Sequence, residues 1–174
     1  MTTIRDAVRA DLAPVQEIYA HHVIHGLASF EETPPDLAEI ERRWRAATEA
    51  GLPYLVAELD GAVVGYAYCG AYRPRPAYRH TVENTVYVAP DRTRLGLGRT
   101  LLSALIERCE GTRVRQMIAV IGDTDNLASI RLHESLGFRN VGTLKGVGFK
   151  HGRWVDSVLL QRTIGPGEDT LPGK

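Results

Sequence analysis

The sequence predicts one α+β (mixed α/β) domain, and three observations indicate this class. Strand-like runs flank Asp60-Gly61 and His151-Gly152, and such dipeptides favour the turns of β-hairpins. Residues 81–109 show a strand, a glycine-containing turn and an amphipathic helix, which is a βα unit. The full order is β α α β β β α β α β β over 174 residues, with no internal repeat and no linker. Hairpins combined with βα units favour a single mixed sheet with one core.

The N-terminal elements are predicted from caps and apolar faces. Residues 3–8 form a short candidate strand, and Asp11 is predicted to cap a helix that runs to about residue 26. A second helix is predicted over residues 36–51, because Asp36 and Glu39 have the spacing of a capping box.

The later elements follow from β-rich runs and from glycine and proline punctuation. They are a hairpin over 53–72, a proline-rich loop over 73–80, a strand over 81–89, a helix over 96–109, a strand over 115–121, a helix over 126–136 and two strands within 138–163. The composition of the last ten residues, 165–174, predicts a flexible tail after a domain that covers residues 1–164.

Composition and charge exclude several classes of protein. Lys plus Arg and Asp plus Glu number 21 each, which argues against a nonspecific binder of nucleic acid or membrane surfaces. The charged N-terminus has no apolar core of a secretory signal, and no apolar run approaches the roughly 20 residues of a membrane helix. Cys69 and Cys109 stand far apart without a CxxC or His/Cys cluster, so we expect reduced thiols in a cytoplasmic protein, with one disulfide as the alternative.

The turn DRTRLGLGRTLL has the features of a phosphate or pyrophosphate cradle. A helix that starts at Gly96 presents unpaired N–H groups and the positive end of its dipole. Gly96 and Gly98 leave the backbone accessible, and Arg92, Arg94 and Arg99 add positive charge. The turn lacks the lysine of a P-loop, and its GxGxxG is incomplete. The alternative is a glycine turn that only packs.

Five segments together resemble one family. The frame Thr93 to Gly98 resembles motif A of the GNAT superfamily of N-acetyltransferases, written Q/R-x-x-G-x-G/A, with Thr93 at the place of the usual Gln or Arg. NLASIRLHESLGF resembles the family's motif B. AYRHTVENTVYV, RLHESLGF, GFKHGRWVD and HVIHGLASFEETPP are similar to segments of its phosphinothricin and methionine sulfoximine acetyltransferase group. The resemblance implies the GNAT fold, a twisted, mostly antiparallel sheet of about seven strands flanked by about four helices.

The resemblance also implies acetyl-CoA as co-substrate, with no metal. The turn would hold its pyrophosphate mainly through backbone amides, and motif B and the strand before the turn would contact its pantetheine arm. The implied cofactor-binding residues are Val86, Tyr87, Val88, Arg94, Leu95, Gly96, Leu97, Gly98, Arg99, Thr100 and Asn126. A trio of histidines at positions 21, 22 and 25 has no fitting carboxylate or cysteine partner for a metal site.

Two residues match catalytic positions of this group. Glu83 matches its catalytic glutamate, and a base is needed because an amine must lose a proton before it attacks a thioester. Strand alternation places Glu83 with Thr85 and Tyr87 on one face, and the alternative is a charged residue on a solvated face. His133 stands where the family has the tyrosine that protonates the departing thiolate, so it is the candidate acid. Its alternative is a packed or surface histidine.

The implied amine is a small amino acid analogue of the phosphinothricin, methionine sulfoximine or methionine sulfone type. The candidate substrate-binding residues are Phe30 as a pocket wall and Arg73, Arg75 and Tyr78 for oxyanions. A homodimer is implied by the resemblance alone. The competing hypotheses are a protein N-terminal or polyamine acetyltransferase, which predicts an open acidic groove, and a non-catalytic acyl-CoA-binding module, which predicts a lost base.

Overall fold

A seven-stranded sheet crosses the molecule in the order β1-β2-β3-β4-β5-β7-β6. The computed structural model describes residues 1–173. Neighbouring strands are antiparallel except for β4 and β5, which are parallel. The strands are β1 (Thr2–Asp6), β2 (Tyr54–Leu59), β3 (Ala62–Ala71), β4 (Thr81–Val88), β5 (Gln116–Gly122), β6 (Arg139–Lys150) and β7 (Arg153–Thr163).

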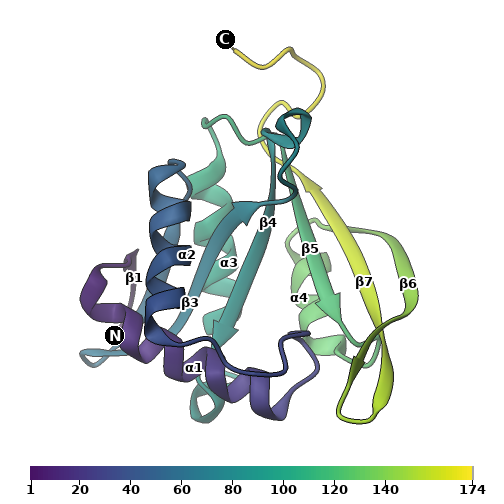
Figure 1. Cartoon of the computed structure of the whole chain (residues 1–174). Coiled ribbons are helices and arrows are strands. Elements are labelled where there is room, and N and C mark those ends of the chain that lie inside the picture. The colour runs from purple at the N-terminus through teal and green to yellow at the C-terminus, as the bar shows by residue number, and fades with distance from the viewer. Residues whose placement is uncertain (174) are drawn as a thin grey trace.

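Four helices cover the two faces of the sheet. They are α1 (Leu12–His25), α2 (Leu37–Glu49), α3 (Leu97–Cys109) and α4 (Leu127–Ser135). Figure 1 shows α1 and α2 on one face and α3 and α4 on the other. This mixed α/β arrangement confirms the predicted fold class and element order. Across residues 1–173, none of the helices is both long enough and apolar enough to cross a membrane.

The parallel strands β4 and β5 are paired over only three residues. Thr81–Glu83 lie opposite Gln116–Ile118, and past Glu83 the two strands have no ladder partners toward each other. Figure 1 shows β4 and β5 diverging from this point. The divergence leaves one edge of β4 unpaired in the middle of the sheet. This opening positions the site described below.

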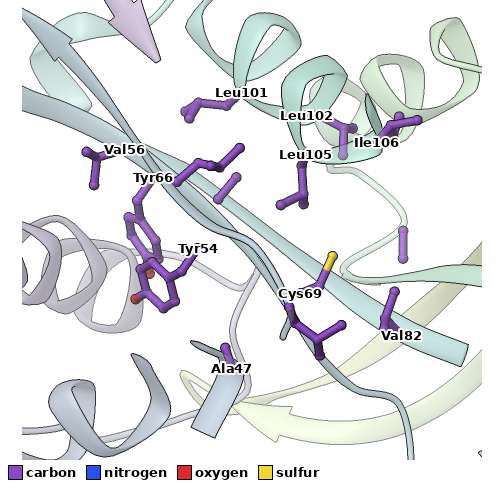
Figure 2. Packing of buried hydrophobic residues seen from close by; sticks show 14 of the residues in the cluster. Ala47, Tyr54, Val56, Tyr66, Cys69, Val82, Leu101, Leu102, Leu105 and Ile106 are labelled. Carbon is purple, nitrogen blue, oxygen red and sulfur yellow. The ribbon is translucent and has the colours of Figure 1, made fainter. Parts of the chain in front are cut away.

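The core lies on both faces of the sheet, and its α3 layer packs against the N-terminal half of the sheet. Leu101, Leu102 and Leu105 have no exposed surface and pack toward β3, as Figure 2 shows. The helix therefore has a fully apolar inner face, as its sequence spacing predicts. Cys69 and Cys109 meet in this layer with their sulfur atoms 3.6 Å apart, and both are free thiols.

Local turn chemistry explains two of the predicted element ends. Asp36 caps α2, because its side chain accepts a hydrogen bond from the Glu39 N–H at 2.8 Å. The hairpin at Asp60-Gly61 has positive φ at both residues, 51° and 82°, as a type I′ turn requires. These predictions are confirmed.

Asp11 stands at the N-cap position of α1 as predicted, but its side chain does not cap the helix. The first strand ends at Asp6, two residues earlier than expected, and a 3-10 turn over Arg9–Asp11 precedes α1. The Asp11 carboxylate makes no cap hydrogen bond to α1 and instead accepts two hydrogen bonds from Arg5, at 2.7 and 2.8 Å, and one from the Val8 N–H. A bidentate guanidinium is a stronger partner for a buried carboxylate than a helix N–H.

The start of the expected flexible tail packs against the body of the protein. Ile164 and Gly167 are buried. Arg115 donates hydrogen bonds to the Gly167 carbonyl and to the Thr170 hydroxyl. The proline and glycine content of the segment therefore supports turns that follow the surface.

Candidate active site

A cavity of about 610 Å³ occupies the opening between β4 and β5. Its lining comes from α1, α2, the segment after α1, strands β2 to β5, β7 and the starts of α3 and α4. A volume of this size suits a small molecule or part of a cofactor. The split in the sheet thus produces the binding site of this fold.

Glu83 lies at the point where the two strands part. It is the last residue of β4 in ladder register with β5, and its side chain lines the cavity. Burial raises the pKa of the Glu83 carboxyl above its ordinary value, because the charged form loses solvation. A carboxylate with a raised pKa is a better proton acceptor near neutral pH than an exposed one. Because β4 has a free edge here, residues of both its faces reach the cavity, Asn84 and Val86 as well as Thr85 and Tyr87.

His133 is buried and bonded at both ring nitrogens. Its Nδ1 lies 2.8 Å from the Ser129 carbonyl oxygen, which can only accept, so Nδ1 carries the proton. Its Nε2 lies 2.9 Å from Asn84 Nδ2 and accepts from that amide in the neutral ring. Burial lowers the pKa of His133, which favours this neutral form. In this arrangement His133 has no proton available for a departing thiolate, contrary to the sequence-based hypothesis. Its contacts instead fix the position of the Asn84 side chain.

The glycine turn has the backbone geometry of an anion cradle. Arg94 and Gly96 both adopt left-handed conformations, with φ of 66° and 74°, and Gly96 is the N-cap of α3. Alternation of this kind turns successive N–H groups toward one side. A Cβ added at Gly96 would meet no atom within 4 Å, so its φ angle, rather than crowding, favours glycine there. Thr93 and Gly98 extend this cradle into the cavity lining.

The other predicted cofactor residues divide into two sets. Those whose side chains or backbone line the cavity are Val86, Tyr87, Val88, Gly98 and Asn126. Those that build the turn or its supports outside the lining are Arg94, Leu95, Gly96, Leu97, Arg99 and Thr100. Leu97 is buried in the core, so only its backbone is available to a ligand. Arg99 donates to the Ser135 hydroxyl at 2.7 Å and so links the start of α3, beside the cradle, to the end of α4.

The predicted substrate residues are not all brought together. Phe30 lines the cavity. Arg73, Arg75 and Tyr78 lie on the exposed loop around a 3-10 turn, Pro76–Tyr78, and they are outside the lining of this cavity. The Arg73 guanidinium lies over the ring of Tyr72, 5.1 Å from its centroid.

Five tyrosines line the cavity, and of these the sequence predicted only Tyr87 as a site residue. They are Tyr19, Tyr54, Tyr66, Tyr68 and Tyr87. Tyr54 and Tyr68 stack with centroids 4.6 Å apart. The alternation in Tyr66-Ala67-Tyr68 is the signal that places two of these rings on one face of a strand.

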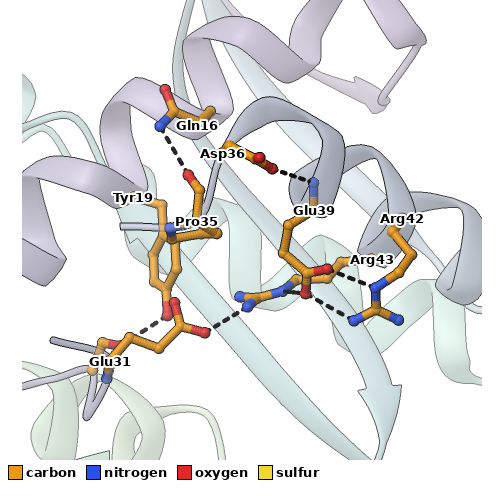
Figure 3. Close-up of polar contacts among 9 residues, drawn as sticks. Gln16, Tyr19, Glu31, Pro35, Asp36, Glu39, Arg42 and Arg43 are labelled. Atoms are coloured by element: carbon orange, nitrogen blue, oxygen red, sulfur yellow. Dashed lines mark hydrogen bonds and ion pairs between the residues drawn. The ribbon is translucent and has the colours of Figure 1, made fainter. Parts of the chain in front are cut away.

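Arg43 of α2 also lines the cavity, and sequence reasoning did not assign it. It pairs with Glu31 at 2.5 Å and with Glu39 at 2.8 Å, as Figure 3 shows. On α1, His22 also lines the cavity and contacts the Val88 carbonyl oxygen through Nε2 at 2.8 Å. Of the three clustered histidines, this one therefore supports β4 beside the cavity.

Comparison with known proteins agrees with this geometry. The family model described as Acetyltransferase (GNAT) domain matches residues 4–159. A phosphinothricin N-acetyltransferase of Alcaligenes faecalis is 55% identical over 170 residues, covering 98% of this chain and 86% of the relative. The L-amino acid N-acyltransferase MnaT of Escherichia coli is 42% identical and covers 91% of this chain and 92% of its own length.

Solved structures show the same relationship. A phosphinothricin acetyltransferase from Sinorhizobium meliloti in complex with AcCoA has a TM-score of 0.96 and 48% identity, with 99% of this chain and 94% of that chain covered. A sheet that splits at β4 and β5, with a glycine cradle at the start of α3, is the architecture of an acetyltransferase. The chain belongs to the GNAT family of acetyltransferases.

Proposed function

We propose that this enzyme transfers the acetyl group of acetyl-CoA to the α-amino group of a small amino acid analogue, of the phosphinothricin, methionine sulfoximine or methionine sulfone type. The observation that carries the proposal is Glu83, a half-buried carboxylate at the split between β4 and β5. Relatives that support this substrate class include a methionine sulfoximine and methionine sulfone acetyltransferase of Pseudomonas paraeruginosa, 43% identical over 165 residues.

The residues present fit acetyl-CoA. The left-handed pair Arg94 and Gly96 and the start of α3 offer N–H groups and positive potential to a pyrophosphate. The edge of β4 past Glu83 is unpaired, so its peptide groups can bind an extended, amide-containing pantetheine arm as a strand would. Thr93, at the position of the family's Gln or Arg, lines the cavity but adds no charge. The backbone N–H groups of the turn would therefore provide most of the contacts to the pyrophosphate.

Glu83 would accept the proton of the amine. The neutral nitrogen then attacks the thioester carbonyl carbon and the new C–N bond forms. The C–S bond breaks, CoA leaves as the thiolate, and the nitrogen gives its second proton to that thiolate or to solvent, which leaves a neutral amide. The raised pKa of Glu83 brings its basicity closer to that of the amine it must deprotonate. Acetylation removes the positive charge of the amino group, and such inactivation of a toxic analogue would give resistance to the cell.

We also propose a cytoplasmic homodimer. The adjacent free thiols Cys69 and Cys109 suit a reducing compartment. Strand β6 ends the sheet and is unpaired on its outer edge. Exposed apolar side chains gather on β6 and β7 and form what we call the β6–β7 patch: Val141, Leu144, Val147, Phe149 and Trp154. An apolar edge of this kind is usually covered by a partner.

A second candidate is acetylation of a protein N-terminus. A ribosomal-protein-alanine N-acetyltransferase from Brucella melitensis matches with a TM-score of 0.90 and 44% identity. Against it, Phe30 and tyrosines line the cavity, and within residues 1–173 Glu83 is the single acidic residue of this lining, which is not an acidic groove. A non-catalytic acyl-CoA-binding module is disfavoured because Glu83 is present in the cavity.

A thiol-release assay tests the substrate class. With acetyl-CoA present, we expect turnover on phosphinothricin, methionine sulfoximine or methionine sulfone, and much less on ordinary amino acids, polyamines or an alanine-terminated peptide. Turnover on the peptide and on none of the analogues would reject the leading substrate class and favour the second candidate.

Replacement of Glu83 by Gln tests the base. Glutamine keeps the shape but cannot accept the proton, so we expect kcat at neutral pH to fall by about 10²- to 10⁴-fold. Binding of CoA, measured by calorimetry, should stay within about twofold, because Glu83 is not part of the cradle. The matched control is Glu110→Gln, an exposed glutamate directly after α3. Unchanged turnover in Glu83→Gln would remove this residue as the base.

A further inference from the structure

The segment GFKHGRWVD, Gly148–Asp156, has no part in the reaction described above. It forms the end of β6, the turn at His151-Gly152 and the start of β7. Its residues alternate between two environments. Phe149 and Trp154 point outward, and their exposed fractions are 56% and 70%. Gly148 and Lys150 face the interior, and both contact the segment after α1.

Lys150 is a buried ammonium group. Only 2% of the residue is exposed, and its Nζ donates a hydrogen bond to the Ser29 carbonyl oxygen at 2.7 Å. Burying a lysine is costly unless its charge is satisfied. The contact joins two segments 121 residues apart, so it fixes the segment after α1 to the end of β6.

Two glycines provide the space for the same segment. A Cβ at Gly148 would lie 2.6 to 2.9 Å from three atoms of the Phe30 ring. A Cβ at Gly122, at the end of β5, would lie 2.2 Å from the Leu27 carbonyl oxygen and 2.9 Å from the Phe30 ring. The ring of Phe30 therefore rests on bare backbone of two strands, and any side chain at these positions would displace it.

Ala28, Ser29 and Phe30 line the cavity, and we call them the Phe30 wall. The side of the wall away from β6 is also fixed. The Tyr19 hydroxyl and the Ser29 hydroxyl lie 2.8 Å apart, and Figure 3 shows the adjoining ion pair of Glu31 with Arg43. Fixed from both sides, the wall has one defined position relative to Glu83.

We propose that Gly148 and Lys150 are positioning residues that set the place of the Phe30 wall and thereby the affinity for the amine substrate. This inference rests on the proposed function, because the wall bounds the amine side of the cavity only if Glu83 is the base. Neither residue lines the cavity, so each acts through Phe30 and Ser29. Their effect should therefore fall on the amine and spare acetyl-CoA.

Lys150→Met removes the donor and keeps an unbranched side chain that is one atom shorter. We expect KM for the amine to rise about ten- to a hundredfold, with KM for acetyl-CoA within about twofold, because a small displacement of a positioning group is costly. Lys145→Met is the matched control: it lies on the same strand, is exposed, and pairs with Asp156 at 2.7 Å. It should leave both KM values within about twofold. An unchanged amine KM in Lys150→Met, or an equal rise in both KM values, would overturn the proposal.

If Lys150→Met does not fold, a double-mutant cycle of Gly148 and Phe30 tests the same proposal. Gly148→Ala should raise the amine KM in the normal background, because its methyl group displaces the Phe30 ring. In a Phe30→Leu background the ring is absent, so the same substitution should have a clearly smaller effect on KM. Equal effects in both backgrounds would show that Gly148 does not act through Phe30.

Hydrogen exchange of the wall gives a readout that does not depend on activity. A peptide covering residues 26–34 should exchange faster in Lys150→Met than in the unsubstituted protein or in Lys145→Met. Equal exchange would overturn the positioning role. If the unsubstituted enzyme acetylates no amine, the proposed function fails, and the exchange result alone decides whether Lys150 positions the wall.

Discussion

At the residue scale, Glu83 is placed where its charge is poorly solvated, although the proposed reaction needs that charged form as the base. Burial in the folded protein raises the pKa of this carboxyl above the ordinary value of 4.5. The folded state therefore binds a proton more tightly than the unfolded state. The contribution of Glu83 to stability is favourable at low pH and is lost as pH rises from about 4.5 through the raised pKa.

Glu83→Gln should consequently stabilise the enzyme at pH 8 while it removes activity. Glutamine carries no charge, so we expect a Tm higher by about 2–4 °C for each kcal/mol regained at pH 8, and no difference at pH 4 or below. Thermal unfolding followed by circular dichroism from pH 4 to pH 8 would check this. A Tm at pH 8 equal to or below that of the unsubstituted protein would contradict the assignment of Glu83 as a poorly solvated carboxylate.

For His133 and Asn84, the sequence pattern does not reveal the hydrogen bonds that determine their roles. The sequence identifies a histidine at the family's acid position, but its role depends on which nitrogen carries the proton. Ser129 and Asn84 decide that, through contacts of 2.8 and 2.9 Å. The buried Asn84 Oδ1 has no hydrogen-bond partner within residues 1–173 and lies at the cavity. The pair is therefore better suited to orient an amide than to supply a proton.

At the element scale, the start of α3 combines a backbone requirement with a binding role. Gly96 and Gly61 have similar φ values, 74° and 82°, and a Cβ at either would meet no atom within 4 Å. Gly61 lies in the hairpin between β2 and β3, outside the cavity lining, and Gly96 begins the cradle. Substitutions at these two glycines can therefore be compared: both introduce backbone strain, but only the one at Gly96 would also affect ligand binding.

Gly96→Ala and Gly61→Ala should both lower stability, by about 1–2 kcal/mol, because alanine disfavours the left-handed conformation. Only Gly96→Ala should also weaken the binding of CoA, since relief of the strain would turn the N–H groups of the cradle. Tm measurements and calorimetric titration with CoA would check the two effects. Equal CoA affinity in the two variants, at equal loss of Tm, would show that the turn is not the cradle.

At the scale of the whole molecule, the order of the strands decides where the exposed apolar surface lies. Strands β7 and β6 extend the sheet beyond β5, and β6 is left at its edge with the β6–β7 patch. Phe149 and Trp154 meet edge to face across the hairpin, with centroids 5.1 Å apart. A large exposed tryptophan in such a cluster is typical of the centre of an interface.

Trp154→Glu should therefore convert the proposed dimer into a monomer. A charge in a closely packed apolar interface would be desolvated without a partner. Sedimentation equilibrium would measure the mass, and Leu37→Glu, another exposed apolar residue at the start of α2, is the control that should remain dimeric. A monomeric unsubstituted protein would reject the dimer, and a dimeric Trp154→Glu variant would exclude this patch as its interface.

The sequence by itself determined the features that depend on neighbouring residues. The cap at Asp36, the turn at Asp60-Gly61 and the glycine start of α3 follow from local hydrogen bonds and φ angles, and the structure confirms them. The same locality explains why the cradle and Glu83 were predicted together, since both lie within the continuous stretch of residues 81–109.

Only the tertiary structure decided which distant groups meet. Arg5 takes the carboxylate of Asp11 away from α1, and Lys150 reaches a carbonyl 121 residues earlier in the chain. The exposed loop of Arg73, Arg75 and Tyr78 stays outside the cavity lining, whereas tyrosines from α1, β2 and β3 that the sequence did not predict join Tyr87 in that lining. These contacts depend on strand order and on the point where β4 leaves β5. Local propensities do not predict these contacts, because the partners are distant in sequence and are brought together only by the folded sheet.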